Sequence, residues 1–164
     1  MKRYLFLDID GVCNHDDWYN HNRFVKKNWK CGDYDPHVIE LLNQLADLDV
    51  KVVISSSWGT LADKPLLDLG LKLPIVGHTE QLSPYCEWLC RGNEIAKWLD
   101  LNVIQEHIDD TYEYVIFDDV QNMLMSQAEN FVYVDKAHGL TQEHIDKARV
   151  ILSGGNMKLD VYEG

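Results

Sequence analysis

Two aspartates one residue apart follow an apolar run near the start of the chain, where residues 4–12 read YLFLDIDGV. Such a run is typical of a buried strand, and the alternation of a strand places Asp8 and Asp10 on the same side. Two carboxylates this close repel each other unless a proton or a cation lies between them. A hard divalent cation prefers oxygen ligands and is the simplest counterpart, and Gly11 allows a tight backbone turn beside it.

Further polar residues follow two other apolar segments. Residues 51–54 form a short strand-like run that ends in Ser55 and Ser56, and residues 114–117 form a run that ends in the adjacent acids Asp118 and Asp119. In parallel sheets, ligands bind where the carboxyl ends of the strands meet. We therefore expect three strand ends to bring these acids and hydroxyls together.

The elements that position these residues alternate between strand and helix along the chain, which predicts a parallel sheet with helices on both faces. Asp35 is expected to cap a helix that has Pro36 at its first position, whereas residues 13–34 are expected to be irregular and residues 77–84 to form a loop. Strands are expected at residues 3–8, 51–54, 75–76, 114–117 and 131–134, and helices after residue 35 and over residues 60–69, 91–99 and 141–152.

The chain resembles the haloacid dehalogenase-like (HAD) phosphohydrolase superfamily over residues 3–152. The first motif of that family, Asp-x-Asp-Gly after an apolar strand, corresponds to residues 7–12, and its second motif, a Ser or Thr at a strand end, to Ser55 or its neighbour Ser56. Its third motif, a basic residue near a helix start, fits Arg91 best, and its fourth, an acidic pair, is Asp118-Asp119. Three segments are similar to small HAD domains associated with RNA repair, some of them linked to polynucleotide kinase or ligase modules: residues 55–58, 91–99 and 134–141.

This resemblance implies an α/β Rossmann-like HAD fold, with a doubly wound, mainly parallel sheet and little or no cap domain. It implies phosphoryl transfer through an aspartyl-phosphate, in which Asp8 attacks phosphorus and Asp10 acts as general acid and then general base. Ser55, with Ser56 as the alternative, would bind a phosphoryl oxygen, and Arg91 would offset the charge of the transferring phosphate.

The resemblance also implies a Mg²⁺ cofactor held by oxygen ligands. These ligands would be a carboxylate oxygen of Asp8, the backbone carbonyl of Asp10 and a carboxylate oxygen of Asp119. Asp118 would act through water or by orienting the ligands.

The bulk composition agrees with one globular domain over residues 1–164, and the resemblance implies that this domain is an HAD-like phosphatase in which residues 13–35 form a small cap or loop insertion. The chain is 46% hydrophobic and 26% charged, as is usual for globular domains. No apolar stretch approaches the roughly 18 residues that a membrane span needs, and acids follow the basic N-terminus where a signal peptide would be apolar. We therefore expect a cytoplasmic protein without a membrane partner.

The expected partner is a phosphorylated substrate, although its identity stays open at this stage. A net charge of −12 argues against extended, sequence-independent binding to nucleic acid, because such binding depends on Lys and Arg. One polynucleotide end in a local pocket is compatible with it, and the short stretches between the motifs favour an open site that suits such a bulky substrate. The loop that could overhang the site carries aromatic and basic residues that would read the leaving group or simply be solvated: His15, Trp18, Tyr19, His21, Arg23, Lys26 and Lys27.

Three alternatives to a polynucleotide phosphatase remain open. A nucleotidase or small-metabolite phosphatase would use the same chemistry on a smaller substrate. A catalytically silent HAD-fold binding protein is disfavoured because the motif acids are all present. A response-regulator receiver also has clustered acids, but its acidic pair lies on the first strand and its phosphorylated Asp ends a middle strand, whereas serines end that strand here.

Overall fold

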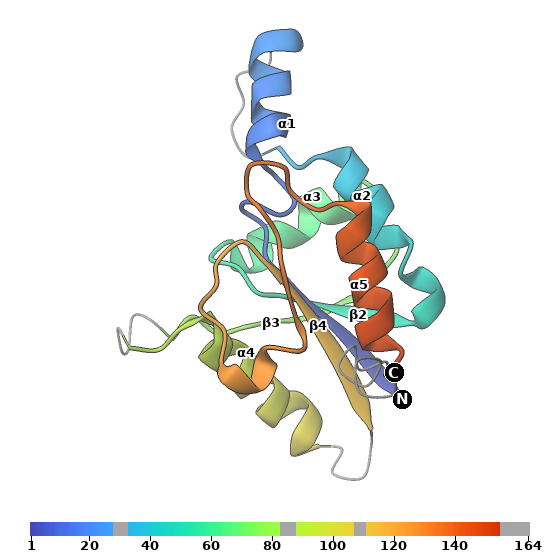
Figure 1. Cartoon of the computed structure of the whole chain (residues 1–164), viewed down its shortest axis with the longest axis vertical. Helices are drawn as coiled ribbons and strands as arrows, with labels where there is room; N and C mark the ends of the chain where they lie inside the picture. The colour runs from blue at the N-terminus through green and yellow to red at the C-terminus, as the bar shows by residue number, and fades with distance from the viewer. Residues whose placement is uncertain (28–32, 83–87, 107–110, 155–164) are drawn as a thin grey trace, which may run out of the picture.

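The computed structural model describes residues 1–27, 33–82, 88–106 and 111–154, which contain a five-stranded parallel sheet of order β3-β2-β1-β4-β5 (Figure 1). Its central strand, β1, is apolar because both faces of the sheet are covered, and Leu5, Phe6 and Leu7 are fully buried. This sheet confirms the predicted Rossmann-like α/β architecture. The strands are β1 (Lys2–Leu7), β2 (Val50–Ile54), β3 (Ile75–His78), β4 (Tyr112–Asp118) and β5 (Phe131–Tyr133).

Helices pack on both faces of the sheet. Leu5 and Leu7 of β1 point toward the apolar residues of α2, α3 and α5, whereas Tyr4 and Phe6 point toward those of α4 and η4. Figure 1 shows α4 on one side of the strands and α2 and α5 on the other. The helical segments are α1 (Asp16–Asn20), η1 (His21–Val25), α2 (Pro36–Asn43), η2 (Ala46–Leu48), η3 (Gly59–Ala62), α3 (Asp63–Asp68), α4 (Arg91–Leu99), η4 (Asp100–Ile104), η5 (Met125–Gln127) and α5 (Gln142–Leu152).

The register of the three central strands brings their polar ends together. Leu7 is paired with Ile54 of β2 on one side and with Phe117 of β4 on the other. The residue that follows each of these three therefore lies at the same edge of the sheet. The backbone N–H of Asp8 donates to the carbonyl of Phe117 across 3.0 Å, and the N–H of Ser55 donates to that of Leu7 across 2.9 Å. These bonds continue the ladder beyond the last strand residue.

The start of α2 is as expected. Asp35 precedes the helix, Pro36 is its first residue, and Oδ1 of Asp35 accepts a hydrogen bond from the backbone N–H of His37 across 3.0 Å. Such a cap satisfies one of the N–H groups that the first helical turn leaves without an intrahelical partner.

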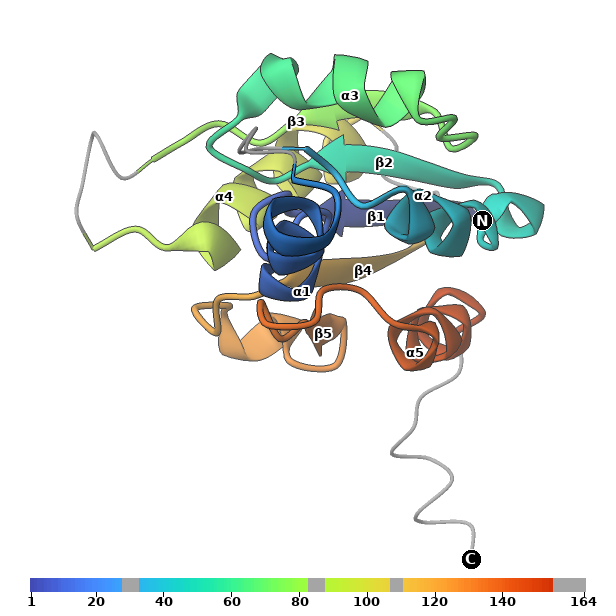
Figure 2. The ribbon, with the colours of Figure 1, turned by 90° about the horizontal axis from the view of Figure 1, so that it is seen from above.

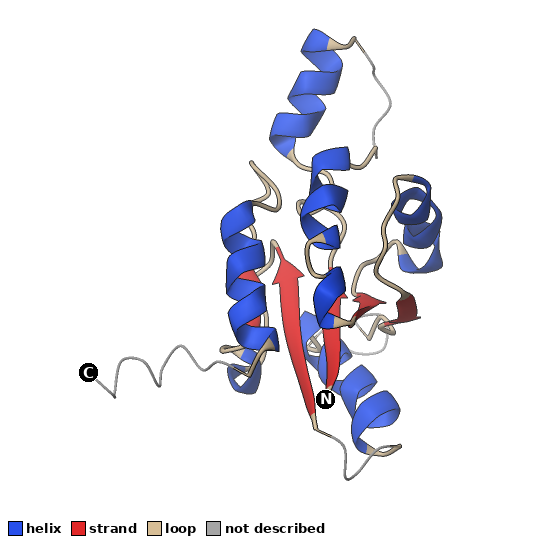
Figure 3. Ribbon diagram, turned by 90° about the vertical axis from the view of Figure 1, so that its right-hand side faces the viewer, coloured by secondary structure: helices blue, strands red, loops and turns tan. Residues whose placement is uncertain are grey.

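The expectation that residues 13–34 are irregular is wrong for residues 16–25, which form the helical segments α1 and η1. We call these residues together with Lys26 and Lys27 the arm, and Figure 3 shows it standing out from the rest of the molecule. Hydrophobic periodicity is missing there because α1 has no buried residue and η1 buries only Asn22. The features that favour a helix lie instead at the start of α1. Nδ1 of His15 accepts a hydrogen bond from the backbone N–H of Trp18, and two acids occupy the first turn. Residues 28–32 lie outside the described part.

The expected loop over residues 77–84 begins later than predicted. Gly77 and His78 belong to β3 and pair with Val53 and Ile54 of β2. A Cβ on Gly77 would lie 2.8 Å from Nε1 of Trp98, so the glycine lets the indole pack directly on the strand. This glycine within a strand therefore reflects a close packing contact rather than a turn. Residues 83 and 84 of the expected loop lie outside the described residues.

The strand order also bears on one alternative. The order 3-2-1-4-5 is that of the dinucleotide-binding type of doubly wound sheet, whereas receiver modules have the order 2-1-3-4-5. The receiver hypothesis is therefore wrong.

Among the described residues, no helix has the length and apolar character needed to cross a membrane.

Candidate active site

Three carboxylates meet at the edge of the sheet where β1 and β4 end. Ligand oxygens of Asp8, Asp118 and Asp119 all lie within 4.8 Å of one another. Asp118 is the last residue of β4 and is fully buried, Asp8 is 4% exposed, and Asp119 is half-buried. The structure thus brings together the acids that the sequence places after two different strands.

Arg91 supplies a positive charge to this cluster from the first position of α4. Its Nη1 lies 3.3 Å from Oδ1 of Asp8 and 3.4 Å from Oδ2 of Asp118, and it also donates a hydrogen bond to the backbone carbonyl of Ser55. One guanidinium therefore contacts residues from the ends of three neighbouring strands. The fixed, planar set of donors of an arginine suits such a position.

A residue that the sequence did not single out holds Arg91 from the other side. Glu94 lies one helical turn later, and its Oε1 is 3.5 Å from Nε of Arg91. Its second oxygen accepts the backbone N–H of Leu82 across 2.8 Å, so the buried carboxylate is itself fixed. The i, i+3 spacing from Arg91 is the sequence signal that could have identified it.

The pKa values of two of these acids, Asp8 and Asp118, are raised. Burial raises the pKa of Asp8 to about 9, and the neighbouring charge of Asp118 adds to this, while Arg91 lowers it. Burial likewise raises the pKa of Asp118 to about 6, against the lowering effect of Arg91. A single guanidinium therefore does not fully compensate the cluster, because the pKa values of both carboxyls remain above the ordinary value for an aspartate.

Asp10 lies apart from the three clustered carboxyls. Its side chain is exposed, whereas that of Asp8 is buried, so the two acids of the first motif have different surroundings. Asp10 Oδ1 accepts from Nδ2 of Asn14 across 3.0 Å, and its Oδ2 accepts from Nε1 of Trp58 across 3.0 Å. Two fixed donors thus orient a carboxylate at the mouth of the site, which is a suitable arrangement for a group that exchanges protons with substrate and water.

Gly11 is required by the approach of Asp119. Its φ is +83°, and a Cβ at this position would lie 2.4 Å from Oδ2 of Asp119. Its backbone N–H donates to Oδ1 of the buried Asn14 across 3.0 Å. The glycine of the first motif therefore serves both the turn and the close packing of an acidic side chain.

The two candidate serines differ in their partners. Oγ of Ser55 is buried and has no hydrogen-bond partner among the described residues. Oγ of Ser56 accepts the backbone N–H of Trp58 across 3.2 Å and so stabilises the turn after β2. A buried hydroxyl without a protein partner is unusual, and this one is free to bind a ligand oxygen.

The donor set fits a divalent cation. Oδ2 of Asp118 is a buried oxygen without a hydrogen-bond partner, although it faces Arg91, and the cluster offers hard oxygen ligands in a space of a few ångströms. Mg²⁺ prefers such carboxylate ligands and keeps several waters. Asp8, Asp118 and Asp119 are therefore the side chains that could hold it.

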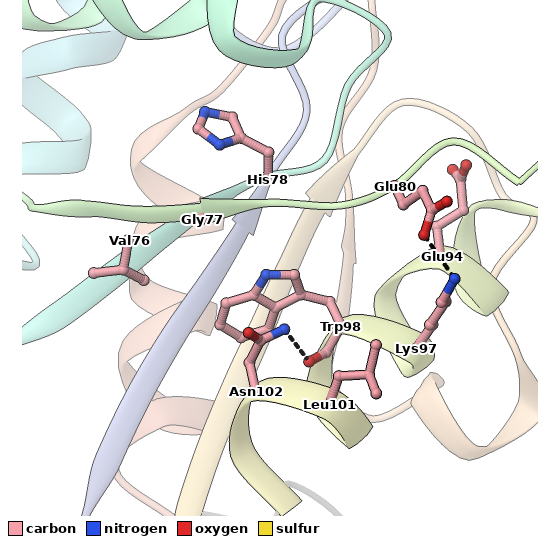
Figure 4. Close-up of a pocket in the computed structure, with 9 residues that line it drawn as sticks. All are labelled: Val76, Gly77, His78, Glu80, Glu94, Lys97, Trp98, Leu101 and Asn102. Atoms are coloured by element: carbon pink, nitrogen blue, oxygen red, sulfur yellow. Dashed lines mark hydrogen bonds and ion pairs between the residues drawn. The ribbon is translucent and has the colours of Figure 1, made fainter. Parts of the chain in front are cut away.

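A separate pocket of about 320 Å³ lies between β3 and α4 (Figure 4). Trp98 lies beside it, and an ion pair of 2.6 Å joins Lys97 to Glu80. None of the predicted catalytic residues lines this pocket, but Glu94 does, and it contacts Arg91 from there. The pocket therefore neighbours the carboxylate cluster without being part of it.

Comparisons with known proteins identify the family. The model of the family described as the HAD domain in Swiss Army Knife RNA repair proteins matches residues 4–145. Neither the curated proteins nor the solved structures gave a match. The matched residues include nearly the whole sheet, from Tyr4 of β1 onward, together with the arm and all the acids described above, and the family indicates a hydrolase of the phosphatase type. The chain therefore belongs to the family of HAD domains found in Swiss Army Knife RNA repair proteins.

Proposed function

We propose that this protein is a Mg²⁺-dependent phosphatase that removes a terminal phosphate from an RNA end through an aspartyl-phosphate on Asp8. The observation that carries the proposal is the position of Asp8, a buried carboxylate 3.3 Å from Arg91 and within 4.8 Å of the acidic pair after β4. A structural carboxylate rarely lies beside two other acids in such a buried place. As one phosphatase domain, the chain would use residues 13–35 as its small cap, and its cytoplasmic location stays a prediction.

In the first step, a carboxylate oxygen of Asp8 attacks phosphorus, and the bond from phosphorus to the leaving oxygen breaks. Asp10, in its protonated form, gives its proton to that oxygen, which departs as a hydroxyl group. Arg91 and the hydroxyl of Ser55 bind phosphoryl oxygens during the transfer. Trp58 and Asn14 hold the carboxyl of Asp10 toward the open side of the site.

In the second step, Asp10 is a carboxylate and takes a proton from water. The oxygen of this water attacks phosphorus, the bond between phosphorus and Asp8 breaks, and phosphate leaves. Asp8 returns as a carboxylate and Asp10 as an acid, so the enzyme is ready for another cycle. The same residue therefore serves as acid and then as base, which explains why it lies exposed at the mouth of the site while Asp8 is buried.

A bound Mg²⁺ would supply positive charge that keeps Asp8 ionised and offsets the charge of the transferring phosphate. Carboxylate oxygens of Asp8 and Asp119 and the backbone carbonyl of Asp10 are the proposed ligands. Asp118 is close enough to serve as a ligand or to orient one. Its other oxygen accepts the backbone N–H of Val120 across 3.0 Å, which fixes the side chain.

Burial around Asp8 favours a terminal phosphate. Asp8, Ser55 and Asp118 are at most 4% exposed, so a phosphodiester within a strand would have to bring nucleotides on both sides into a confined place. A terminal phosphomonoester carries a nucleotide on only one side of the phosphate, so it can enter this place more easily. The family, described by its occurrence in RNA repair proteins, supports an RNA end as the substrate.

The decisive experiment measures phosphate release by the wild type and by Asp8→Asn. Its substrates are RNA and DNA oligonucleotides with a 5′- or a 3′-phosphate, mononucleotides and sugar phosphates, each with Mg²⁺ or with a chelator. We expect release from RNA ends that needs Mg²⁺ and is lost in the variant. Asp119→Asn, which keeps the nucleophile, is expected to need much more Mg²⁺.

Two other results would contradict parts of the proposal. Preferred hydrolysis of mononucleotides or sugar phosphates would make the protein a nucleotidase or small-metabolite phosphatase with the same chemistry. If the folded wild type binds Mg²⁺ but releases no phosphate from any substrate, the protein is a silent binding protein. Calorimetric titration with Mg²⁺ shows whether an inactive protein still binds the metal or has lost it.

A further inference from the structure

The arm differs in charge from the rest of the molecule. Residues 18–27 carry three cations, Arg23, Lys26 and Lys27, and no acid, in a chain whose net charge is −12. The two acids of the arm, Asp16 and Asp17, lie at its base, and Asp17 is paired there with His138 at 2.7 Å. The outer part of the arm is therefore rich in cations, although the chain as a whole is acidic.

The arm begins near Asp10, at the mouth of the proposed site, and is held there. It starts two residues after Asn14, which donates to Asp10, and its first two backbone N–H groups donate to the carbonyls of Lys136 and Ala137, each across 3.0 Å. Nε2 of His15 is 2.7 Å from Oδ2 of Asp35, which ties the base of the arm to the start of α2. Figures 1 and 2 show that α1 rises above the carboxyl end of β1. The base of the arm is therefore fixed at the mouth of the proposed site.

Two of the aromatic side chains of the arm, Trp18 and Phe24, have different surroundings. Trp18 is used within the arm: its Nε1 donates to the carbonyl of Asp33 across 3.1 Å, and Nζ of Lys26 lies 5.2 Å from the centre of its ring. Phe24 is instead 69% exposed, with the guanidinium of Arg23 5.9 Å from the centre of its ring. An exposed aromatic ring beside cations is the combination with which proteins bind unpaired bases and their phosphates.

We infer that the arm binds the single-stranded part of a nucleic acid whose terminal phosphate lies at Asp8, with Phe24 stacking on a base and Arg23, Lys26 and Lys27 contacting the backbone. This inference rests on the proposed function, because it takes the phosphate to be at Asp8. It deepens that function by naming the residues that distinguish a polynucleotide from a nucleotide.

The chemistry of the arm favours a single strand over a duplex or a protein. Stacking needs a base whose face is free, which a duplex does not offer within its helix. An acidic protein partner would match the three cations but would not need an exposed aromatic ring next to them. Ten helical residues extend about 15 Å, so the arm can contact only a few nucleotides. A short contact of this kind agrees with the charge of the chain, which opposes an extended footprint.

The test measures binding of a fluorescent, unphosphorylated single-stranded RNA of ten nucleotides by anisotropy over a series of salt concentrations. For three backbone contacts, the slope of log K against log salt concentration is expected to be about −2. Phe24→Ala is expected to weaken binding about tenfold and Phe24→Trp to preserve it. The triple variant Arg23→Gln, Lys26→Gln, Lys27→Gln is expected to abolish the salt dependence. Lys72→Ala is the control for charge. Lys72 is an exposed lysine that precedes the amino end of β3, whereas the proposed site lies at the carboxyl ends of the strands.

The same proteins are assayed for phosphate release from a phosphorylated ten-nucleotide RNA and from a mononucleotide. The arm variants are expected to raise KM for the RNA about tenfold and to leave the rate on the mononucleotide within about twofold. If the wild type does not bind the RNA, or if Phe24→Ala and the triple variant bind it like Lys72→Ala, the inference is wrong. If the RNA binds through the arm but no phosphate is released, the proposed function fails while the binding surface stands.

Discussion

The indole nitrogen of Trp58 and the carboxylate of Asp10 are joined by a hydrogen bond of 3.0 Å. Trp58 follows β2, whereas Asp10 follows β1, so this bond fixes two loops relative to each other at the edge of the sheet. The indole is half-buried, packs against the core and meets the ring of Tyr34 edge-on with their centres 5.6 Å apart. An anchored ring thus presents its one donor to the proposed acid and base.

Trp58→Phe keeps most of the packing and removes this donor. We expect kcat to fall about tenfold with KM changed less than about twofold, because the substrate still binds but Asp10 is less well oriented for proton transfer. Steady-state kinetics with Mg²⁺ measure both constants. Trp98→Phe removes an indole nitrogen from the pocket beside β3 and is the matched control. An equal loss in both variants would mean that Trp58 acts only through packing.

Gly11→Ala is expected to weaken Mg²⁺ binding. The new Cβ would come within 2.4 Å of Oδ2 of Asp119, so this carboxylate must shift from its place in the cluster. We expect the Mg²⁺ concentration for half-maximal activity to rise about tenfold or more, which is the usual effect of disturbing the groups around a metal ligand. Calorimetric titration with Mg²⁺ gives the same quantity without a substrate.

Gly70→Ala is the control for backbone strain at Gly11. Gly70 has a φ of +93°, close to the +83° of Gly11, but no atom lies within 4 Å of a Cβ built there. Both variants are expected to lower the free energy of unfolding by about 1 kcal/mol, because both force alanine into a left-handed conformation. Only Gly11→Ala is expected to alter Mg²⁺ binding. Equal effects on metal binding would show that stability, not Asp119, is responsible.

The sequence predicted the sheet and the acidic cluster well because each depends on strong local patterns. The apolar runs before Asp8 and Asp118 are long enough to mark buried strands, and parallel pairing then brings their ends together with that of β2. Asp35 and Pro36 likewise give a local signal for the start of α2. These features need no knowledge of distant contacts.

Other features depend on contacts between distant segments and leave no periodic signal. The arm is helical without a buried face, so hydrophobic spacing does not predict it. Trp58 donates to a residue 48 positions away, which no local pattern in the sequence indicates. The difference between Ser55 and Ser56 depends on how the turn after β2 folds back onto Trp58. Each of these features depends on tertiary contacts that the local sequence does not determine.

The raised pKa of Asp8 predicts how stability depends on pH in the absence of Mg²⁺. The folded pKa of about 9 lies above the ordinary value of 3.8, chiefly because of burial, so the folded state holds this proton more tightly than the unfolded state. The resulting stability is fully present below about pH 4 and is lost as the pH rises toward 9. We therefore expect Tm in a chelator to fall between about pH 5 and about pH 8.

Thermal unfolding of the wild type and Asp8→Asn over this pH range tests that expectation. The amide cannot ionise, so the fall in Tm is expected to be smaller in the variant. Asp118, whose pKa is raised to about 6, contributes only in the lower part of the range. Mg²⁺ is expected to raise Tm of the wild type more at about pH 8 than at about pH 5, since it binds the ionised cluster. A wild-type Tm that rises with pH in the chelator would contradict the raised pKa.

Ser55→Ala and Ser56→Ala are expected to have opposite effects on stability. Oγ of Ser55 is buried without a partner among the described residues, so its removal should leave the free energy of unfolding unchanged or raise it by up to about 1 kcal/mol. Oγ of Ser56 accepts the backbone N–H of Trp58, and its loss should lower that free energy by about 1 kcal/mol. Urea unfolding measures both changes.

Activity should follow the reverse pattern if Ser55 is the residue that binds the phosphoryl group. Ser55→Ala is expected to lower kcat/KM about tenfold to a hundredfold and to weaken inhibition by inorganic phosphate, because a buried donor to the phosphoryl oxygen is lost. Ser56→Ala is expected to leave phosphate inhibition unchanged, since its hydroxyl is occupied by the turn. If removing the Ser55 hydroxyl stabilises the fold but impairs phosphate binding, its role is to bind the ligand rather than to stabilise the protein. Weaker phosphate inhibition in Ser56→Ala alone would instead assign the contact to Ser56.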